Sequence, residues 1–426
     1  MKKAAVTTLG CKVNQVESNA IMEQLEAKGY EIVDFSNDAD LYIINTCTVT
    51  NRTDYKSRNL IRQALSRKEI NPEVKIIVTG CYAQKDKQAI EKLGKIDLIV
   101  DNQAKINSDE WLDNVAYDFR DINQADSFNW VQFSRMHERT RAFIKIEDGC
   151  NYYCAYCAVP YGRGRPRSLE LDKVVAQVQA LRQKDYHEIV LTGVNLGLYK
   201  DDTSGINLGD LVMILANIDP ALKIRLSSIE PDLWNNDLLS AIKNSLNICP
   251  HFHLPLQSGS DSVLKRMKRR YTAEQISDLV CELRKIKPHC AIGLDVICGF
   301  PGETEAEFTQ SFELIKSLPV AYLHVFGFSP RKATPAATMP SQITGSVIKE
   351  RVRIMTDLSK QKKTEYQNEL ISEDVLLSGI VEKNNTLATA LSDHYIRIYK
   401  DAVNQPVNTT ISGKAVRKYK DGILIN

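Results

Sequence analysis

The sequence predicts an α/β protein with three parts: a doubly wound parallel sheet, a central partial barrel of six strand–helix units, and a small antiparallel β-barrel. Strand and helix patterns alternate through the first hundred residues and again from residue 141 onward, which is typical of parallel sheets. After residue 363 the pattern changes to short strands with polar turns, which is typical of a small antiparallel barrel. A chain of 426 residues has room for two or three domains.

Composition excludes several classes of protein. A hydrophobic content of 43% and a charged content of 25% are those of an ordinary globular protein. The net charge of +2 provides no global field, so we expect no DNA partner, and any nucleic-acid contact must come from local patches. No apolar run is long enough to span a bilayer, so we expect a cytoplasmic protein without a membrane partner. Ten cysteines in such a chain favour metal ligation over disulfides.

The first domain is predicted at residues 1–118. Its first helix carries an apolar stripe of Ala20, Ile21 and Leu25, and Gly29 follows as a stop signal. Polar residues then replace the periodic pattern, which predicts a linker at 119–139 and irregular structure around 111–115. We expect strands at residues 3–9, 41–45, 74–78 and 98–100, and helices at 15–28 and 52–67.

Three of these strands end at a cysteine, namely Cys11, Cys47 and Cys81. Ligands gather at the carboxyl ends of the strands in an open α/β sheet, so we expect these thiols to converge although they lie far apart in the sequence. The alternative is three independent buried cysteines, because cysteine is often a small core residue. The shared position at three strand ends favours convergence.

The central domain is predicted at residues 140–362. Chemistry in strand–helix barrels lies on the loops at the carboxyl ends of the strands. We expect strands at 142–146, 188–192, 223–227, 251–256, 291–296 and 322–328. We expect helices at 171–184, 208–218, 233–243, 273–286 and 305–318.

The loop after the first of these strands carries three cysteines at C-x3-C-x2-C spacing, Cys150, Cys154 and Cys157. Three thiolates on one short loop suit an iron–sulfur cluster, and because a fully protein-bound cubane has four, one iron stays open for another ligand. A zinc site is the alternative, but zinc sites usually add a second pair of ligands, and none follows nearby.

Polar, glycine-rich loops follow the next four strands, at residues 191–195, 227–231, 256–260 and 299–304. Small residues let a cofactor approach the backbone, and the Glu230 carboxylate suits a ribose hydroxyl or an ammonium group. Each loop alone is ordinary turn sequence, but together they occur at the same end of the barrel as Cys150.

Two basic segments are candidates for nucleic-acid contact. Lys268, Arg269 and Arg270 belong to a basic run before a helix, which favours a phosphate partner over a merely solvated helix end. The last domain, predicted at 366–426, has strands at 375–381, 387–390, 395–399, 407–415 and 423–425. Its candidates are the cations Arg397, Arg417 and Lys418, and the rings of Tyr395, Tyr399 and Tyr419, which could stack on bases. A plain capping barrel is the alternative.

The cysteine loop resembles that of the radical S-adenosylmethionine enzymes. The segments 148–151 and 160–165, and those around Cys11, Cys47 and Cys81, are similar to the methylthiotransferase branch of that family. Residues 392–399 resemble the RNA-binding TRAM module, an OB-like barrel, so the resemblance covers essentially the whole chain. The segments 11–15 and 46–52 look most like the type that acts on N6-threonylcarbamoyladenosine in tRNA.

The resemblance implies two [4Fe-4S] clusters, one on Cys150, Cys154 and Cys157 and an auxiliary one on Cys11, Cys47 and Cys81. It implies that S-adenosylmethionine binds the open iron of the first cluster and the barrel loops. The expected cofactor-binding residues are Thr192, Gly193, Asn195, Ser227, Glu230, Gln257 and Asp295. Arg331, in barrel-end sequence that also resembles the family, joins the residues expected to contact nucleic acid. The implied partners are tRNA and a flavodoxin- or ferredoxin-like electron donor, with the sulfur source undefined.

The implied reaction is 2-methylthiolation of N6-threonylcarbamoyladenosine beside the anticodon, with two S-adenosylmethionine molecules. One donates the methyl group, and the other is the source of a 5′-deoxyadenosyl radical, because no protein acid or base usefully deprotonates adenine C2. Related alternatives are methylthiolation of isopentenyladenosine in tRNA or of a ribosomal protein. A non-catalytic iron–sulfur redox sensor that binds RNA is the more distant alternative.

Overall fold

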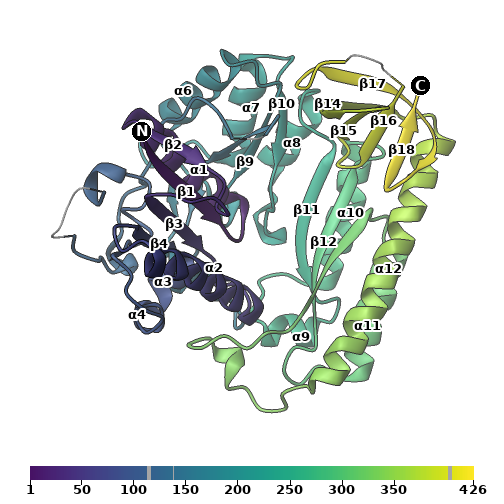
Figure 1. Cartoon of the computed structure of the whole chain (residues 1–426). Coiled ribbons are helices and arrows are strands. Elements are labelled where there is room, and N and C mark those ends of the chain that lie inside the picture. Colours follow the sequence, from purple (N-terminus) through teal and green to yellow (C-terminus); the bar gives the residue numbers. More distant parts are fainter. Residues whose placement is uncertain (113–116, 138, 402–404) are drawn as a thin grey trace.

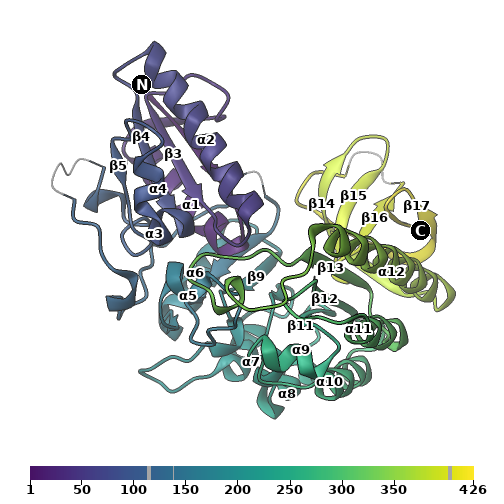
Figure 2. The same cartoon turned by 90° about the horizontal axis from the view of Figure 1, so that it is seen from below.

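A computed structural model describes residues 1–112, 117–137, 139–401 and 405–426. Figure 1 shows the N-terminal sheet, the central strands with their outer helices, and the C-terminal barrel as three neighbouring regions. Figure 2, turned by 90°, separates the N-terminal region from the C-terminal barrel, with the central region adjoining both. None of the helices in the described part of the chain is both long and apolar enough to cross a membrane.

The N-terminal region is the predicted doubly wound parallel sheet. The strand order is β2-β1-β3-β4-β5, and every pair is parallel. Alternate residues of β3 face opposite sides: Leu41 and Ile43 pack toward α1, whereas Tyr42 and Ile44 pack toward α2. The strands are β1 (Lys2–Thr8), β2 (Tyr30–Val33), β3 (Leu41–Thr46), β4 (Lys75–Gly80) and β5 (Leu98–Ile99). The helices are α1 (Lys12–Ala27), α2 (Asn51–Ile70), α3 (Cys81–Lys85) and α4 (Lys87–Glu91).

The polar stretch after β5 has little regular structure, with short 3-10 turns at Ser108–Glu110 and Ile122–Gln124. Trp111 is buried in the N-terminal core, while residues 113–115 of the predicted irregular segment lie outside the described residues. Phe133 and Met136 are buried in the core of the central domain. The predicted linker is therefore packed against the central domain along part of its length.

The six predicted central strands are all present, and they form two three-stranded parallel sheets. One sheet has the order β10-β9-β6 and the other β11-β12-β13. An isolated bridge joins Ile224 of β10 to Ile248, which precedes β11. The barrel is open because its outer strands, β6 and β13, do not pair with each other. The strands are β6 (Ala142–Lys145), β9 (Glu188–Thr192), β10 (Lys223–Leu226), β11 (His251–Gln257), β12 (Ala291–Cys298) and β13 (Tyr322–Gly327).

The predicted helices around these strands are also present, as α6 (Leu171–Arg182), α7 (Leu208–Ile218), α8 (Asn236–Asn244), α10 (Ala273–Ile286) and α11 (Glu305–Ser317). The structure adds the hairpin β7 (Glu147–Asp148) and β8 (Arg167–Ser168), and the short helices α5 (Val159–Arg163) and α9 (Asp261–Arg266). It also adds the long helix α12 (Gly345–Ser372), which lies beside both the central strands and the C-terminal barrel (Figure 2). The predicted boundary between residues 362 and 366 falls inside α12.

The C-terminal region is a closed barrel with the order β14-β15-β16-β18-β17. Its strands are β14 (Leu376–Asn384), β15 (Ala388–Ser392), β16 (Arg397–Lys400), β17 (Thr410–Tyr419) and β18 (Gly422–Ile425), as predicted. Arg225 of β10 donates to the backbone carbonyls of Ser392 and Asp393, each at 3.0 Å. The turn between β15 and β16 is thereby attached to the central domain.

Candidate active site

The structure brings together the three cysteines that end the central strands of the N-terminal sheet. Cys11, Cys47 and Cys81 follow β1, β3 and β4, and all three line one cavity of about 550 Å³. Gly10 permits this approach: its φ is +102°, and a Cβ on it would lie 2.7 Å from the Sγ atom of Cys47. Asn14 links the same strand ends, because its amide donates to the carbonyls of Leu9 (2.7 Å) and Thr46 (3.0 Å).

The environment of these thiols fits a bound metal centre. Burial, and then the nearby thiols of Cys81 and Cys11, raise the pKa of Cys47 to about 12. Metal ligands must be deprotonated, and a bound cation offsets the mutual repulsion of thiolates. The three thiols are therefore suited to bind a metal ion, which displaces their protons.

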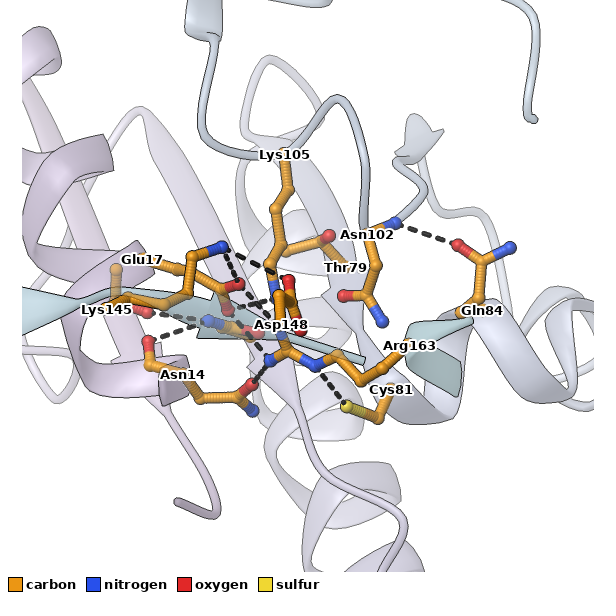
Figure 3. Close-up of polar contacts among 12 residues, drawn as sticks. Asn14, Glu17, Thr79, Cys81, Gln84, Asn102, Lys105, Lys145, Asp148 and Arg163 are labelled. Carbon is orange, nitrogen blue, oxygen red and sulfur yellow. Dashed lines mark hydrogen bonds and ion pairs between the residues drawn. The ribbon is translucent and has the colours of Figure 1, made fainter. Parts of the chain in front are cut away.

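A buried ion-pair network next to Cys81 joins the N-terminal and central domains (Figure 3). Arg163 of α5 donates from Nε to the Sγ atom of Cys81 at 3.2 Å. The same guanidinium pairs with Glu17 of α1 and with Asp148 of β7. Four cations therefore surround two carboxylates, because Lys105, Lys145 and Arg167 also pair with them. Arg163 brings part of this positive charge to Cys81, where a thiolate would balance it.

Glu17 is the central anion of this network and is 1% exposed. Burial raises the pKa of its carboxyl, but Arg163, Lys105 and Lys145 outweigh burial and lower the pKa from 4.5 to about 2. The carboxylate is therefore charged at neutral pH, although the protein covers it.

Glu17→Gln is expected to lower the free energy of unfolding at pH 7 by about 3 kcal/mol, from the pKa difference in Glu17. Because the pKa of Glu17 is lowered in the folded state, its carboxylate stabilises the fold at pH values above 4.5. That contribution is lost as the pH falls toward 2. The difference in the free energy of unfolding between parent and variant should thus be constant from pH 7 to 5 and shrink below pH 4.5. It is measured by urea unfolding. Glu26→Gln is the control on the same helix: its partner Arg135 is 55% exposed, so a loss below about 1 kcal/mol is expected. An equal loss in both variants would contradict the prediction.

The second set of thiols lies on the loop between β7 and α5. Gly149, with φ of +93°, turns the chain so tightly that a Cβ on it would lie 2.0 Å from the carbonyl oxygen of Arg165. The backbone N–H of Cys150 donates to the carbonyl of Gly164 at 3.0 Å, which closes the loop. Burial, and then the thiol of Cys154, raise the pKa of Cys157 to about 12. These three thiols thus form a second compact group of candidate ligands, and each group of three is called a ligand set below.

Each ligand set faces its own cavity, and the two cavities adjoin. Cys150, Cys154 and Cys157 line a cavity of about 480 Å³. It shares wall residues with the cavity of about 550 Å³ that holds the N-terminal cysteines. Cys11 is one of the shared residues, so it borders both spaces. The others are Val49, Val159, Val194, Ser228, Asp295 and Phe326.

Two family models match the chain. The "Uncharacterized protein family UPF0004" matches residues 3–101, which hold the N-terminal cysteines, and the "Radical SAM superfamily" matches residues 144–315, which hold the cysteine loop. A threonylcarbamoyladenosine tRNA methylthiotransferase of Aquifex aeolicus is 38% identical over 413 residues, which are 95% of this chain and 98% of that protein. The chain belongs to the radical S-adenosylmethionine methylthiotransferases. The family's radical domain implies S-adenosylmethionine and a [4Fe-4S] cluster as cofactors.

Other methylthiotransferases also match the chain over nearly its whole length. The Bacillus subtilis protein of the threonylcarbamoyladenosine type is 37% identical over 99% of this chain and 96% of its own length. A tRNA-2-methylthio-N(6)-dimethylallyladenosine synthase of Thermodesulfovibrio yellowstonii is 30% identical over 99% of this chain and 98% of its own length. Among solved structures, a radical S-adenosylmethionine methyltransferase, TsrM, of Kitasatospora setae matches with a TM-score of 0.58. At 14% identity over 79% of this chain and 75% of that chain, it supports the fold alone.

The predicted cofactor-binding residues of this methylthiotransferase divide between the two cavities. Asn195, Glu230 and Gln257 line the cavity of the cysteine loop, and Asn195 Nδ2 lies 4.0 Å from Cys150 Sγ. Asp295 lies in the shared wall. Thr192, Gly193 and Ser227 line the cavity of the N-terminal cysteines instead.

Asp295 is held by two histidines that sequence reasoning did not identify. The ring nitrogens of His253 and His324 lie 3.2 and 3.3 Å from its Oδ1 atom. Burial raises the pKa of Asp295, but hydrogen bonds from the two histidines outweigh it and lower the pKa. The methylthiotransferase therefore keeps a carboxylate on the wall between its two ligand sets.

Two residues predicted to contact nucleic acid are buried, which corrects that expectation. The Arg269 side chain is 2% exposed, pairs with Glu230 and donates to Cys154 Sγ at 3.1 Å. The Arg331 side chain is 3% exposed and pairs with Asp54 at the start of α2. Arg269 thus supports the cysteine loop from outside it, and Arg331 joins the central and N-terminal domains.

The other predicted contacts have accessible side chains. Lys268 and Arg270 are exposed, and the Arg270 guanidinium lies 3.8 Å over the ring of Tyr152 in the cysteine loop. On the C-terminal barrel, Arg417 and Lys418 are exposed, and Arg397 is partly exposed beside Asp421 at 3.4 Å.

The three tyrosines of the C-terminal barrel have different positions. Tyr399 is buried and packs edge-on against Tyr419, which corrects the expectation that its ring stacks on a base. Tyr419 remains partly exposed. Tyr395 lies in the wall of the cavity of the N-terminal cysteines, so this barrel contributes to the active-site region.

Proposed function

We propose that this enzyme adds a methylthio group to C2 of N6-threonylcarbamoyladenosine in tRNA, beside the anticodon. One observation carries the proposal: two sets of three thiols face adjoining cavities, with Cys11 and Asp295 in the shared wall. A methylthiotransferase must activate a carbon–hydrogen bond and present sulfur to the same carbon. Two adjoining ligand sets provide the two functions within reach of one base.

The cavity of the cysteine loop fits S-adenosylmethionine. Its wall presents the carboxylate of Glu230 and the amide of Asn195, and the Oδ1 atom of that amide is buried without a hydrogen-bond partner. Such an atom is suited to a polar ligand. When bound, the cluster and S-adenosylmethionine supply the one-electron chemistry that activates an inert carbon–hydrogen bond. Arg269 orients the Glu230 carboxylate and places positive charge beside Cys154.

We infer that Cys11, Cys47 and Cys81 hold a second [4Fe-4S] cluster, which carries the sulfur for transfer. The cationic network around Arg163 supports this inference, because it places excess positive charge next to three thiols. Thiolates and an anionic cluster are stabilised by such an environment. A flavodoxin- or ferredoxin-like protein is inferred as the electron donor.

The relatives favour the threonylcarbamoyladenosine type of substrate. Five curated relatives of that type are 35–38% identical, whereas those of the dimethylallyladenosine type are 30–32% identical. The test is mass spectrometry of tRNA nucleosides from a strain lacking the gene. Loss of the 2-methylthio derivative of threonylcarbamoyladenosine, restored by the parent gene, supports the proposal. Loss of the isopentenyladenosine derivative instead would assign the enzyme to the second type.

Replacing Lys268 and Arg270 together by alanine should weaken tRNA binding and reduce its dependence on salt. Each phosphate contact contributes about one to the slope of log K against log salt, so the slope should fall by about two. Arg269 stays unchanged in this variant, because it contacts Glu230 and Cys154. Binding is measured by fluorescence anisotropy at several salt concentrations.

Lys285→Ala with Lys316→Ala is the matched control. It removes the same charge from exposed lysines of the outer helices α10 and α11. An unchanged slope in the Lys268/Arg270 variant, or an equal change in the control, would contradict the prediction. Lys268 and Arg270 would then be solvated surface residues that do not contact phosphates.

A further inference from the structure

In the wall of the cavity of the N-terminal cysteines, Lys12 is a cation without an ion-pair partner among the described residues. Arg163 in that wall binds Glu17 and Asp148. By contrast, among the described residues no carboxylate oxygen lies within 4.0 Å of the amine of Lys12. Lys12 begins α1 and is partly exposed into the cavity. Its ammonium group is therefore available to an anion that enters the cavity.

Ser227 and His251 each have a buried polar atom in the same wall without a hydrogen-bond partner in the described part of the chain. Ser227 is 8% exposed and His251 is 3% exposed. Neither the Oγ atom of Ser227 nor the Nδ1 atom of His251 has a hydrogen-bond partner among the described residues. The other ring nitrogen of His251 contacts the hydroxyl of Tyr322 at 2.7 Å. Buried polar atoms are nearly always paired, so this wall is suited to a ligand that brings its own donors and acceptors.

The C-terminal barrel limits access of water to this wall. Tyr395, in the turn between β15 and β16, has a φ of +58° and stacks on His251 with ring centroids 4.1 Å apart. The Arg225 guanidinium lies 5.5 Å from the Tyr395 ring and is fixed by Glu188. Ion pairs and hydrogen bonds are stronger where water is restricted, so a group bound here is selected by its charge.

We propose that this wall binds the threonylcarbamoyl group of the substrate adenosine and that Lys12 pairs with its carboxylate. The proposal rests on the proposed function and identifies the residue that determines substrate type. The threonylcarbamoyl group carries a carboxylate, a hydroxyl and a urea, which match one ammonium group and two unpaired polar atoms. An isopentenyl group offers none of these and would leave all three unsatisfied, and such a mismatch is strongly rejected.

The position agrees with the chemistry required at C2. Lys12 adjoins Cys11, and Cys11 borders the cavities of both ligand sets. A nucleoside whose substituent is held at Lys12 therefore keeps its base close to the wall shared by the two cavities. Lys12 is a specificity residue in this arrangement and takes no part in the transfer itself.

The test uses three anticodon stem-loops and the reconstituted full-length protein. The loops carry threonylcarbamoyladenosine, its threonyl methyl ester, or unmodified adenosine at the target position. The parent should bind the free acid about 10- to 100-fold more tightly than the ester, as expected for a charged hydrogen bond. The ester should still bind more tightly than unmodified adenosine, because it keeps the hydroxyl and the urea. K12M should bind the acid and the ester equally, and K12R should keep part of the preference for the acid. K3M replaces an exposed lysine of β1 and should behave as the parent.

Two outcomes would overturn the proposal: equal binding of acid and ester by the parent, or a K12M variant that binds all three loops more weakly by one factor. The second outcome would assign Lys12 to RNA phosphates or to support of the N-terminal thiols, and iron content separates those two roles. If K12M takes up less iron than the parent, the proposal is still tested by the parent protein alone, through its binding of the free acid compared with the methyl ester. A parent that binds neither modified loop better than the unmodified one would contradict the proposed substrate itself.

Discussion

Cys154→Ala is expected to abolish formation of 5′-deoxyadenosine from S-adenosylmethionine and to remove about half of the bound iron. Cys154 is buried in the loop and receives a hydrogen bond from Arg269, so alanine removes one of three ligands at the core of the site. Even outer-shell partners of metal ligands contribute about 10- to 100-fold, so the loss should exceed about a hundredfold. The measurement is anaerobic incubation with dithionite, with chromatography of the nucleoside product and an iron assay.

Cys281→Ala is the control for this variant. Cys281 is exposed on α10, so its replacement should leave both iron content and nucleoside formation at the parental level. A Cys154→Ala protein that still formed 5′-deoxyadenosine would refute the assignment of Cys150, Cys154 and Cys157 as the radical site. A parent protein that formed none would favour the redox-sensor alternative.

Cys47→Ala is expected to separate the two functions of the enzyme. Cys47 lies in the N-terminal domain, and none of its loop neighbours is a ligand of the other set, so 5′-deoxyadenosine should form at close to the parental rate. Methylthiolated tRNA should be undetectable, because two thiolates hold a cluster poorly. The two products are measured in one reaction containing tRNA with threonylcarbamoyladenosine.

The iron content of Cys47→Ala is an independent measurement that tests the same prediction. About half the parental iron should remain, and Cys290→Ala, a buried cysteine that precedes β12, should retain all of it. Full iron in Cys47→Ala, or methylthiolated product despite the loss of iron, would show that the N-terminal thiols are not the sulfur-presenting site.

Most strands and helices could be predicted because their patterns are local. Two of the exceptions, β2 and α12, have identifiable causes. Strand β2 is short and lies at the sheet edge, where its residues are only partly buried. Helix α12 has a core-facing stripe through Met355, Leu358, Tyr366 and Leu370, but Lys362 interrupts it. Lys362 is buried because its amine donates to the carbonyl of Leu318 at 2.9 Å.

The thiols of the candidate site could be predicted, whereas the residues around them could not. Cysteine spacing and position at strand ends are visible in the sequence, but the direction of a charged side chain is not. Arg269 lies in a basic run, yet it turns inward to Glu230, 39 residues away. Arg163 reaches Glu17 from 146 residues away. Such contacts depend on how distant segments of the chain pack together, so no local sequence pattern predicts them.

The hydrogen bond from Arg163 to Cys81 has a consequence for synthesis of the protein. The thiol leaves the ribosome 82 residues before the guanidinium that supports it. A nascent chain that has only just released its first domain therefore exposes three cysteines without their electrostatic support. Assembly of the proposed second cluster on these thiols is then favoured only after the central domain has been translated and has docked. Cells that produce the first domain alone should accumulate a protein that stays free of iron, so the domain order imposes a time order on maturation.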